Sequence, residues 1–91
     1  MKLINLYIGS DNITKEVNLN LIENFLNKYF DGYALFKNDG YYKGLKESSV
    51  KIEILTDITK TKLFNLIKEL KVLLNQNSIL LTIDKPKVEF I

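Results

Sequence analysis

Alternating apolar and polar residues predict a β-strand near the start of the chain and a second one near its middle. The first covers residues 3–8, and the second covers residues 50–54, where aliphatic side chains face one way and charged ones the other. Two short apolar runs, residues 33–36 and 79–83, predict two more strands. After a proline break, residues 88–91 are expected to pair as a short fifth strand.

Two other segments repeat apolar residues every three or four positions, which is the period of an amphipathic helix. The first helix is expected over residues 19–29, with Asn18 or Asn20 as its N-cap. The second is expected from the N-cap Thr59 to about Leu74. The predicted buried faces consist of Ile22, Phe25, Leu26 and Tyr29 in the first helix and Leu63, Leu66, Ile67, Leu70, Leu73 and Leu74 in the second.

Turn-forming residues separate these elements. Residues 9–12 form a turn cluster, and residues 75–77 end the second helix. The Asn-Asp-Gly sequence at residues 38–40 is typical of a bulge or a tight turn, after which Tyr41 and Tyr42 continue the strand.

The order β-α-β-β-α-β predicts an α+β fold of the ferredoxin-like type, in one domain over residues 1–91. We expect an antiparallel sheet with residues 50–54 in a central strand. Both helices should cover the face that carries Val50, Ile52 and Ile54. Such a sheet leaves edges and one face open, so we also expect a homo-oligomer, most simply a dimer.

Composition excludes several kinds of chemistry. The chain has no Cys, His or Trp, and all thirteen cationic residues are lysines. Disulfides, zinc sites and Ser-His or Cys-His nucleophiles therefore cannot form. No acidic cluster or glycine-rich phosphate loop is present either, so we expect no metal, no cofactor and no enzymatic activity.

The charge pattern bears on partners and location. The net charge is only +2, and the lysines are spread among acidic residues, which does not favour nucleic-acid binding. No apolar stretch reaches the length of a membrane span, and the apolar start lacks a signal-peptide cleavage site. We therefore expect a cytoplasmic protein with no membrane contact.

The polar and aromatic stretch over residues 38–49 is the strongest candidate site. Tyr41 and Tyr42 could stack on a base, while Lys43 and Lys46 could neutralise a phosphate. Since successive strand residues point to opposite faces, one tyrosine is expected in the core and the other in the site. The alternative is a hairpin whose tyrosines pack against a helix or a neighbouring subunit.

Two weaker candidates remain. Gln76 and Ser78 could hydrogen-bond the edge of a ligand, or they could cap the second helix and close a turn. Glu47 beside Ser48 and Ser49 could pair an acid with a nucleophile, although no base is available to activate the serine.

Four short motifs follow one another along the chain: F-x-G at residues 30–32, G-x-Y at 40–42, E-x-S at 47–49 and Q-x-S-I-L at 76–80. The series resembles that of a family of small uncharacterised bacterial and phage proteins, which shows F-x-G, G-x-W, E-x-S and Q-x-S-V-L along a β-α-β-β-α-β chain. Tyr42 stands where that family has tryptophan, and Lys43 where it often has arginine. The resemblance covers nearly the whole chain and implies the same fold.

More loosely, the chain resembles phage anti-defence proteins, including the anti-Thoeris and anti-CBASS sponges that sequester cyclic nucleotide signals within oligomers. This resemblance implies a non-enzymatic protein that binds a small nucleotide-like ligand. An alternative is an inhibitor that binds a bacterial defence enzyme through a strand edge or sheet face. A third hypothesis is a hydrolase or lyase that uses Glu47, Tyr41 or Tyr42.

Overall fold

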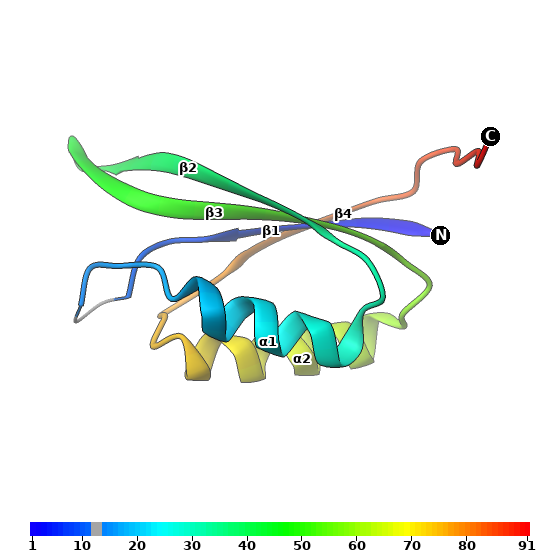
Figure 1. Ribbon diagram of the computed structural model, residues 1–91, viewed down its shortest axis with the longest axis horizontal. Helices are drawn as coiled ribbons and strands as arrows, with labels where there is room; N and C mark the ends of the chain where they lie inside the picture. Colours follow the sequence, from blue (N-terminus) through cyan, green and yellow to red (C-terminus); the bar gives the residue numbers. More distant parts are fainter. Residues whose placement is uncertain (12–13) are drawn as a thin grey trace.

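The computed structural model describes residues 1–11 and 14–91 of the chain (Figure 1). The elements are β1 (Lys2–Ile8), α1 (Leu19–Tyr29), β2 (Ala34–Tyr42), β3 (Leu45–Thr56), α2 (Lys60–Leu73) and β4 (Leu80–Asp84). The predicted turn at residues 9–12 includes Asn12, which lies outside the described residues.

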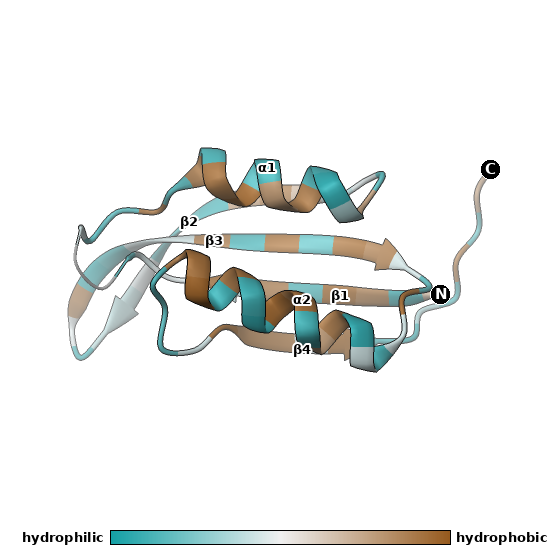
Figure 2. Ribbon diagram, turned by 90° about the horizontal axis from the view of Figure 1, so that it is seen from below, coloured by the Kyte–Doolittle hydropathy of each residue, from teal (hydrophilic) through white to brown (hydrophobic). Residues whose placement is uncertain are grey.

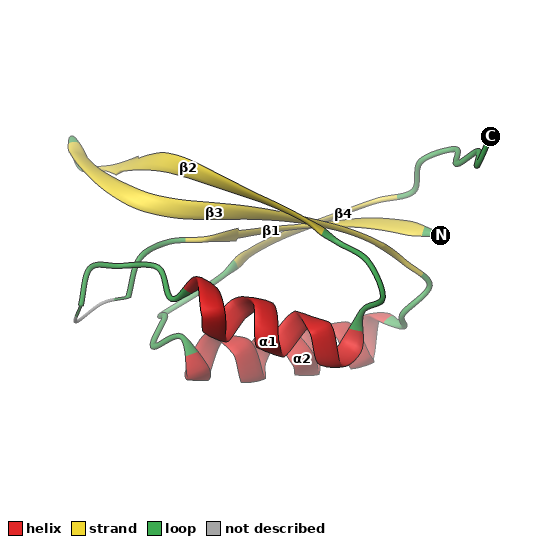
Figure 3. Cartoon of the chain, viewed as in Figure 1, coloured by secondary structure: helices red, strands yellow, loops and turns green. Residues whose placement is uncertain are grey.

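The four strands form one antiparallel sheet in the order β2-β3-β1-β4. Both helices lie on the same side of this sheet, as Figure 3 shows. α1 covers the β2–β3 half and α2 covers the β1–β4 half (Figure 2). The predicted ferredoxin-like α+β fold is therefore confirmed, and so is the interior position of the strand that contains residues 50–54.

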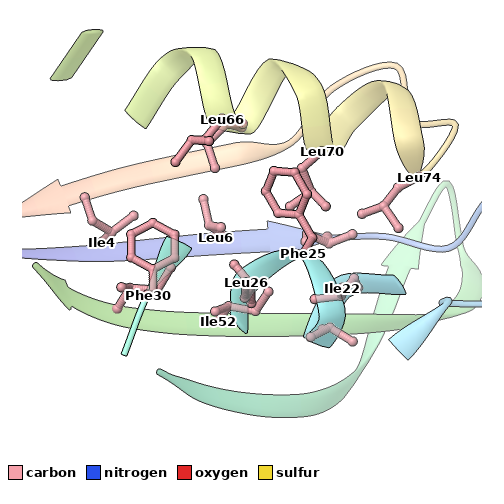
Figure 4. Close-up of a cluster of buried hydrophobic side chains, with 14 of the residues drawn as sticks. Ile4, Leu6, Ile22, Phe25, Leu26, Phe30, Ile52, Leu66, Leu70 and Leu74 are labelled. Atoms are coloured by element: carbon pink, nitrogen blue, oxygen red, sulfur yellow. The ribbon is translucent and has the colours of Figure 1, made fainter. Parts of the chain in front are cut away.

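The core lies between the sheet and the two helices (Figure 4). In β3, the side chains of Val50, Ile52 and Ile54 are buried, as the alternation predicts. Ile52 is paired with Leu6 of β1, so the most buried positions of the two central strands lie side by side. Burial of such aliphatic side chains is the main force that holds helices to one face of a sheet.

Both helices begin at predicted caps. The side chain of Asn18 accepts a hydrogen bond from the backbone N–H of Leu21 at 3.1 Å. The Thr59 hydroxyl accepts one from the backbone N–H of Lys62 at 3.3 Å. Each bond satisfies an N–H that has no partner within the first helical turn.

Two residues predicted to be buried are exposed. Tyr29 lies at the end of α1, where one side of its ring packs on Phe25 at 5.1 Å between centroids and the rest faces solvent. Leu73 lies at the margin of the α2 apolar stripe, so the helix turns it away from the sheet and half of its surface stays exposed.

The predicted turn or bulge at residues 38–40 is wrong. These residues lie within β2, where Asn38 pairs with Ser49 and Gly40 with Glu47. A two-residue turn at positions 39 and 40 would pair Leu35 with Gly44 and leave Ile52 without a partner from this strand. In the observed register Leu35 pairs with Ile52, which extends the buried row across the sheet.

The actual turn is formed by Lys43 and Gly44, which follow the last β2 residue and precede the first residue of β3. Both have positive φ angles, 51° and 78° respectively. This is the pattern of a type I′ turn, whose twist matches that of the strands it joins.

Replacing Gly44 with alanine is expected to lower the free energy of unfolding by about 1–2 kcal/mol, because an L-residue is strained at positive φ. Gly32→Ala is the matched control. A Cβ at either position meets nothing within 4 Å, but only Gly44 has a positive φ. Urea denaturation that shows equal losses in the two variants would contradict this role of Gly44 in the turn.

The predicted fifth strand is also wrong. Residues 85–91 contain no strand, and the chain leaves the end of the sheet on the side away from the helices (Figures 1 and 3). Phe90 is 83% exposed, and Ile91 is also exposed. β4 is an edge strand, and the one neighbour with which it pairs in the chain is β1. Residues 85–91 therefore follow β4 without adding a strand to the sheet.

Candidate functional site

The hairpin formed by β2 and β3 projects beyond the helices, and residues 14–18, which lead into α1, lie beneath it (Figure 1). Between them is a cleft of about 480 Å³, which we call the hairpin cleft. It is lined by Glu16, Val17, Leu19, Lys37, Asn38, Asp39, Ser48, Ser49 and Val50. This volume lies within the range of small-molecule sites, about 300–1,000 Å³.

Strand register explains which side chains face the cleft. Val50 points to the helix side of the sheet and is buried, and Lys37 is its partner in β2. Asp39 pairs with Ser48 two residues farther along each strand. The side chains of Asp39 and Ser48 therefore point to the same face of the sheet as those of Lys37 and Val50. The hairpin thus supplies one cation, one carboxylate and one hydroxyl to a cleft whose inner end is apolar.

Charges of both signs meet at the cleft. Glu16 approaches from the segment before α1, opposite Lys37 and Asp39 on the hairpin. The Asp39 carboxylate pairs with the Lys46 ammonium at 3.4 Å, and both side chains are about 60% exposed. An exposed pair of this kind contributes little stability, so a ligand could replace either partner at low cost.

Tyr41 and Lys46 form the next pair outward on the same hairpin face. Tyr41 is 71% exposed, which leaves its ring free to contact a ligand at the mouth of the cleft. Of the predicted site residues, these two are placed beside the cleft.

Tyr42 and Lys43 lie elsewhere. Tyr42 points to the opposite face of the sheet and is 64% exposed, with the Lys43 ammonium 5.4 Å from its ring centroid. Because Tyr41 is also exposed, the expectation that one of the two tyrosines is in the core is wrong. The hairpin tip extends past both helices, so neither helix covers the Tyr41 ring, and Tyr42 is on the face of the sheet that carries no helix (Figure 1).

Neither Gln76 nor Ser78 lines the hairpin cleft, and Ser78 lies instead in a depression beside α2. The Gln76 side chain donates a hydrogen bond to the carbonyl of Ser10 at 2.6 Å, and its backbone N–H bonds to the carbonyl of Lys71. Asn75, with φ of 54°, donates to the carbonyl of Val72, which completes a Schellman cap. These contacts favour the capping interpretation for Gln76.

The open face of the sheet has its own polar row. The Lys51 ammonium lies 3.0 Å from the Glu53 carboxylate and 5.8 Å from the Tyr7 ring centroid. The hydrogen bond to Glu53 raises the pKa of Lys51 above its ordinary value. Glu47 also belongs to this face, because it pairs with Gly40, whereas Tyr41 points to the other side. The fold therefore does not place Glu47 next to Tyr41.

The described part of the chain contains neither a cluster of metal-ligating side chains nor a helix that could span a membrane. In residues 1–11 and 14–91, no three His, Cys, Asp or Glu side chains lie together as a metal site. Neither helix in these ranges is long and apolar enough to span a membrane.

Comparison with known proteins supports the fold. No family model matches the chain, and no curated protein is significantly similar to it. Among solved structures, a phage SAM lyase in its apo state superposes with a TM-score of 0.66 at 17% identity, over 91% of this chain and 78% of that one. A phage SAM lyase in complex with S-methyl-5′-thioadenosine gives 0.62 at 16% identity, over 92% and 80%.

A third structure with this fold is a DUF3240 family protein from Shewanella baltica OS155. Its TM-score is 0.61 at 12% identity, over 99% of this chain and 94% of that one. These identities are low, so the likeness concerns the fold.

The expectation that the protein is not an enzyme is contradicted, because two of these structures are of a SAM lyase, which is an enzyme. The exclusion rested on the absence of His, Cys, an acidic cluster and a glycine-rich phosphate loop, and it covers only the reactions that need one of these features. Carboxylates, tyrosine and lysine also transfer protons in enzymes, and all three kinds of side chain occur at the hairpin cleft or its mouth.

Proposed function

We propose that this protein is a phage-type anti-defence protein that binds a small nucleoside or nucleotide-like ligand in the hairpin cleft. The observation that carries the proposal is the composition of the cleft. It has an apolar inner end, charges of both signs, and an exposed tyrosine at its mouth. Small-ligand sites combine an apolar lining with a few polar groups that fix the ligand's orientation.

The cleft is chemically suited to a purine nucleoside that carries both charges. A purine ring would stack on Tyr41, and the Ser48 hydroxyl, which points into the cleft, would bond one of its polar edges. S-adenosylmethionine adds a cationic sulfonium and an amino-acid group. Glu16 or Asp39 would hold the cation, and Lys37 the carboxylate. We therefore place S-adenosylmethionine and S-methyl-5′-thioadenosine first among the ligands to test.

Binding would act by withdrawing the ligand from the host enzymes that use it. Sequestration of this kind needs many copies of the protein in the bacterial cytoplasm, since each chain supplies one cleft. Formation of an oligomer is also part of the proposal. A second candidate function is cleavage of the bound ligand. It is favoured by the fold shared with a SAM lyase and by the two carboxylates of the cleft.

Calorimetric titration of the 1–91 chain with S-adenosylmethionine and with S-methyl-5′-thioadenosine tests the proposal. We expect saturable binding of one ligand per cleft. Chromatography of the S-adenosylmethionine samples after incubation reports cleavage in the same experiment. Absence of saturable heat with these two compounds, ATP and cyclic dinucleotides at millimolar concentration would refute the proposal.

Ser48→Trp provides the site-specific control. An indole at this position fills the cleft, so binding should be lost. In Glu47→Trp the neighbouring residue of the same strand carries the indole on the opposite face, and binding should persist. Equal binding by both variants would place the ligand outside the cleft.

A further inference from the structure

A second hollow runs along the outer side of α2, between this helix and β4. It consists of two adjoining depressions of about 560 and 230 Å³, which share Phe64 and Leu81. We call it the α2–β4 groove. Its floor is apolar and is formed by Phe64, Ile67, Ile79, Leu81 and Ile83. None of its residues lines the hairpin cleft, so this groove is separate from the proposed ligand site. A role for it in assembly rests on the oligomer formation that the proposed function includes, and ligand binding by calorimetry tests the cleft separately.

The charged side chains that line the α2–β4 groove are all positive. Its lining contains Lys2, Lys60, Lys68, Lys71 and Lys85, and no Asp or Glu is among the described residues that line it. Lys2 donates to the carbonyl of Ile58 at 2.8 Å. Within the described ranges the other four lysines form no ion pair. Like charges gathered around an apolar floor attract a segment that is apolar and acidic.

The groove also borders a free sheet edge. β4 is the last strand of the sheet, and its backbone pairs only with β1. The outer side of an edge strand presents N–H and C=O groups to any extended segment beside it. Phe64, in the middle of the groove, is 43% exposed although it is a large aromatic residue.

The chain itself contains a segment with the complementary chemistry. Residues 88–91 read Val-Glu-Phe-Ile, and they have no secondary structure. Phe90 is 83% exposed, and Ile91 next to it is exposed as well, so two adjacent large apolar side chains are available for contact. In an extended segment, Val88 and Phe90 point one way and Glu89 the other. Val88 and Phe90 would then face the apolar floor of the α2–β4 groove, and Glu89 would face the lysines at its rim.

We propose that residues 88–91 of one copy bind in the α2–β4 groove of a second copy. Phe90 packs on Phe64 and Leu81, and Glu89 lies among the rim lysines. Binding within one chain is opposed by the geometry. The segment starts from Lys85 at the groove itself and leaves on the opposite side of the sheet from α2 (Figure 1). Exchange of this segment between copies closes as a reciprocal dimer or as a ring.

The first test is the oligomeric state of the 1–91 chain by light scattering and sedimentation at tens of micromolar. The parent should be an oligomer, and Phe90→Ser should weaken association by about 30-fold, as loss of a central aromatic anchor does. Tyr42→Ser removes an exposed aromatic from the hairpin and should leave association unchanged. A monomeric parent, or a Phe90→Ser variant that associates like the parent, overturns the proposal.

Cysteine pairing identifies the interface directly, because the chain has no cysteine of its own. A mixture of Phe64→Cys and Phe90→Cys can form a mixed disulfide only between copies. Under mild oxidation this species should exceed, by about tenfold, the one formed from Val72→Cys and Phe90→Cys. Val72 is an exposed residue of the same helix outside the groove. Equal yields from the two mixtures overturn the proposal.

Reversing the charges of Glu89 and Lys68 provides an independent test of the proposed contact between them. Glu89→Lys should dissociate the oligomer by placing a further cation among the rim lysines. Combining it with Lys68→Glu should restore association, because an opposite pair is then recreated across the interface. Failure of the double variant to recover, while both single variants remain folded by circular dichroism, counts against Glu89 lying at this rim.

Discussion

Replacing Ile52 with alanine is expected to lower the free energy of unfolding by about 4 kcal/mol, near the upper end of large-to-small core changes. Ile52 has no exposed surface and lies in the strand at the interior of the sheet. It pairs with Leu6 on one side and Leu35 on the other, so the cavity left by the substitution is flanked by side chains whose strands are held in place by the sheet's hydrogen bonds.

Urea denaturation followed by circular dichroism measures this loss. Leu45→Ala removes the same kind of side chain from the same strand, where it is 69% exposed, and should change stability by less than about 0.5 kcal/mol. Ile67→Ala in α2 should fall lower in the range of about 2–5 kcal/mol, since Ile67 keeps 9% of its surface exposed. If Ile52→Ala costs no more than Leu45→Ala, the buried face has been assigned to the wrong side.

The fold was predictable because hydrophobic periodicity records burial directly. The alternation at Val50, Ile52 and Ile54 identified both the strand and its buried face. Thr59 was predicted as a cap because its side chain can accept a hydrogen bond from a backbone N–H, and for the first helix the same reasoning left Asn18 and Asn20 open, of which the structure has Asn18. In each case the local signal and the global packing favour the same structure.

The hairpin shows where a local signal is overruled. Asp39-Gly40 is among the strongest turn signals in a sequence. The turn nevertheless forms at Lys43-Gly44, because only a turn at this later position places Leu35 opposite Ile52. Register is decided by burial across strands, and a sequence does not display that pairing until the turn is known.

The misplaced turn also concealed the cleft. With β2 extended to Tyr42, positions 37, 39 and 41 fall on one face, and the hairpin supplies three polar or aromatic side chains to one side. Glu16 could not be found from strand alternation. It reaches the cleft from an irregular segment before α1, whose path depends on tertiary contacts and has no periodic signal.

The two adjacent tyrosines give the sharpest test of the site. Tyr41→Ala should weaken binding of S-methyl-5′-thioadenosine by about ten- to a hundredfold, because stacking on an aromatic side chain contributes about 1–3 kcal/mol per base. Tyr42→Ala removes the same side chain from the next residue, on the opposite face of the hairpin, and should leave binding unchanged. Both rings are exposed, so neither substitution should disturb the core.

Calorimetric titration of the two variants beside the parent measures the effect, with each fold checked by circular dichroism. Lys43→Ala belongs in the same series, since Lys43 lies in the turn and its ammonium is over Tyr42. It should bind like the parent, whereas Lys46→Ala, next to Tyr41, should bind more weakly. A loss in Tyr42→Ala with Tyr41→Ala unaffected would move the ligand to the open face of the hairpin, where Lys43, Leu45 and Glu47 would be the side chains nearest to it.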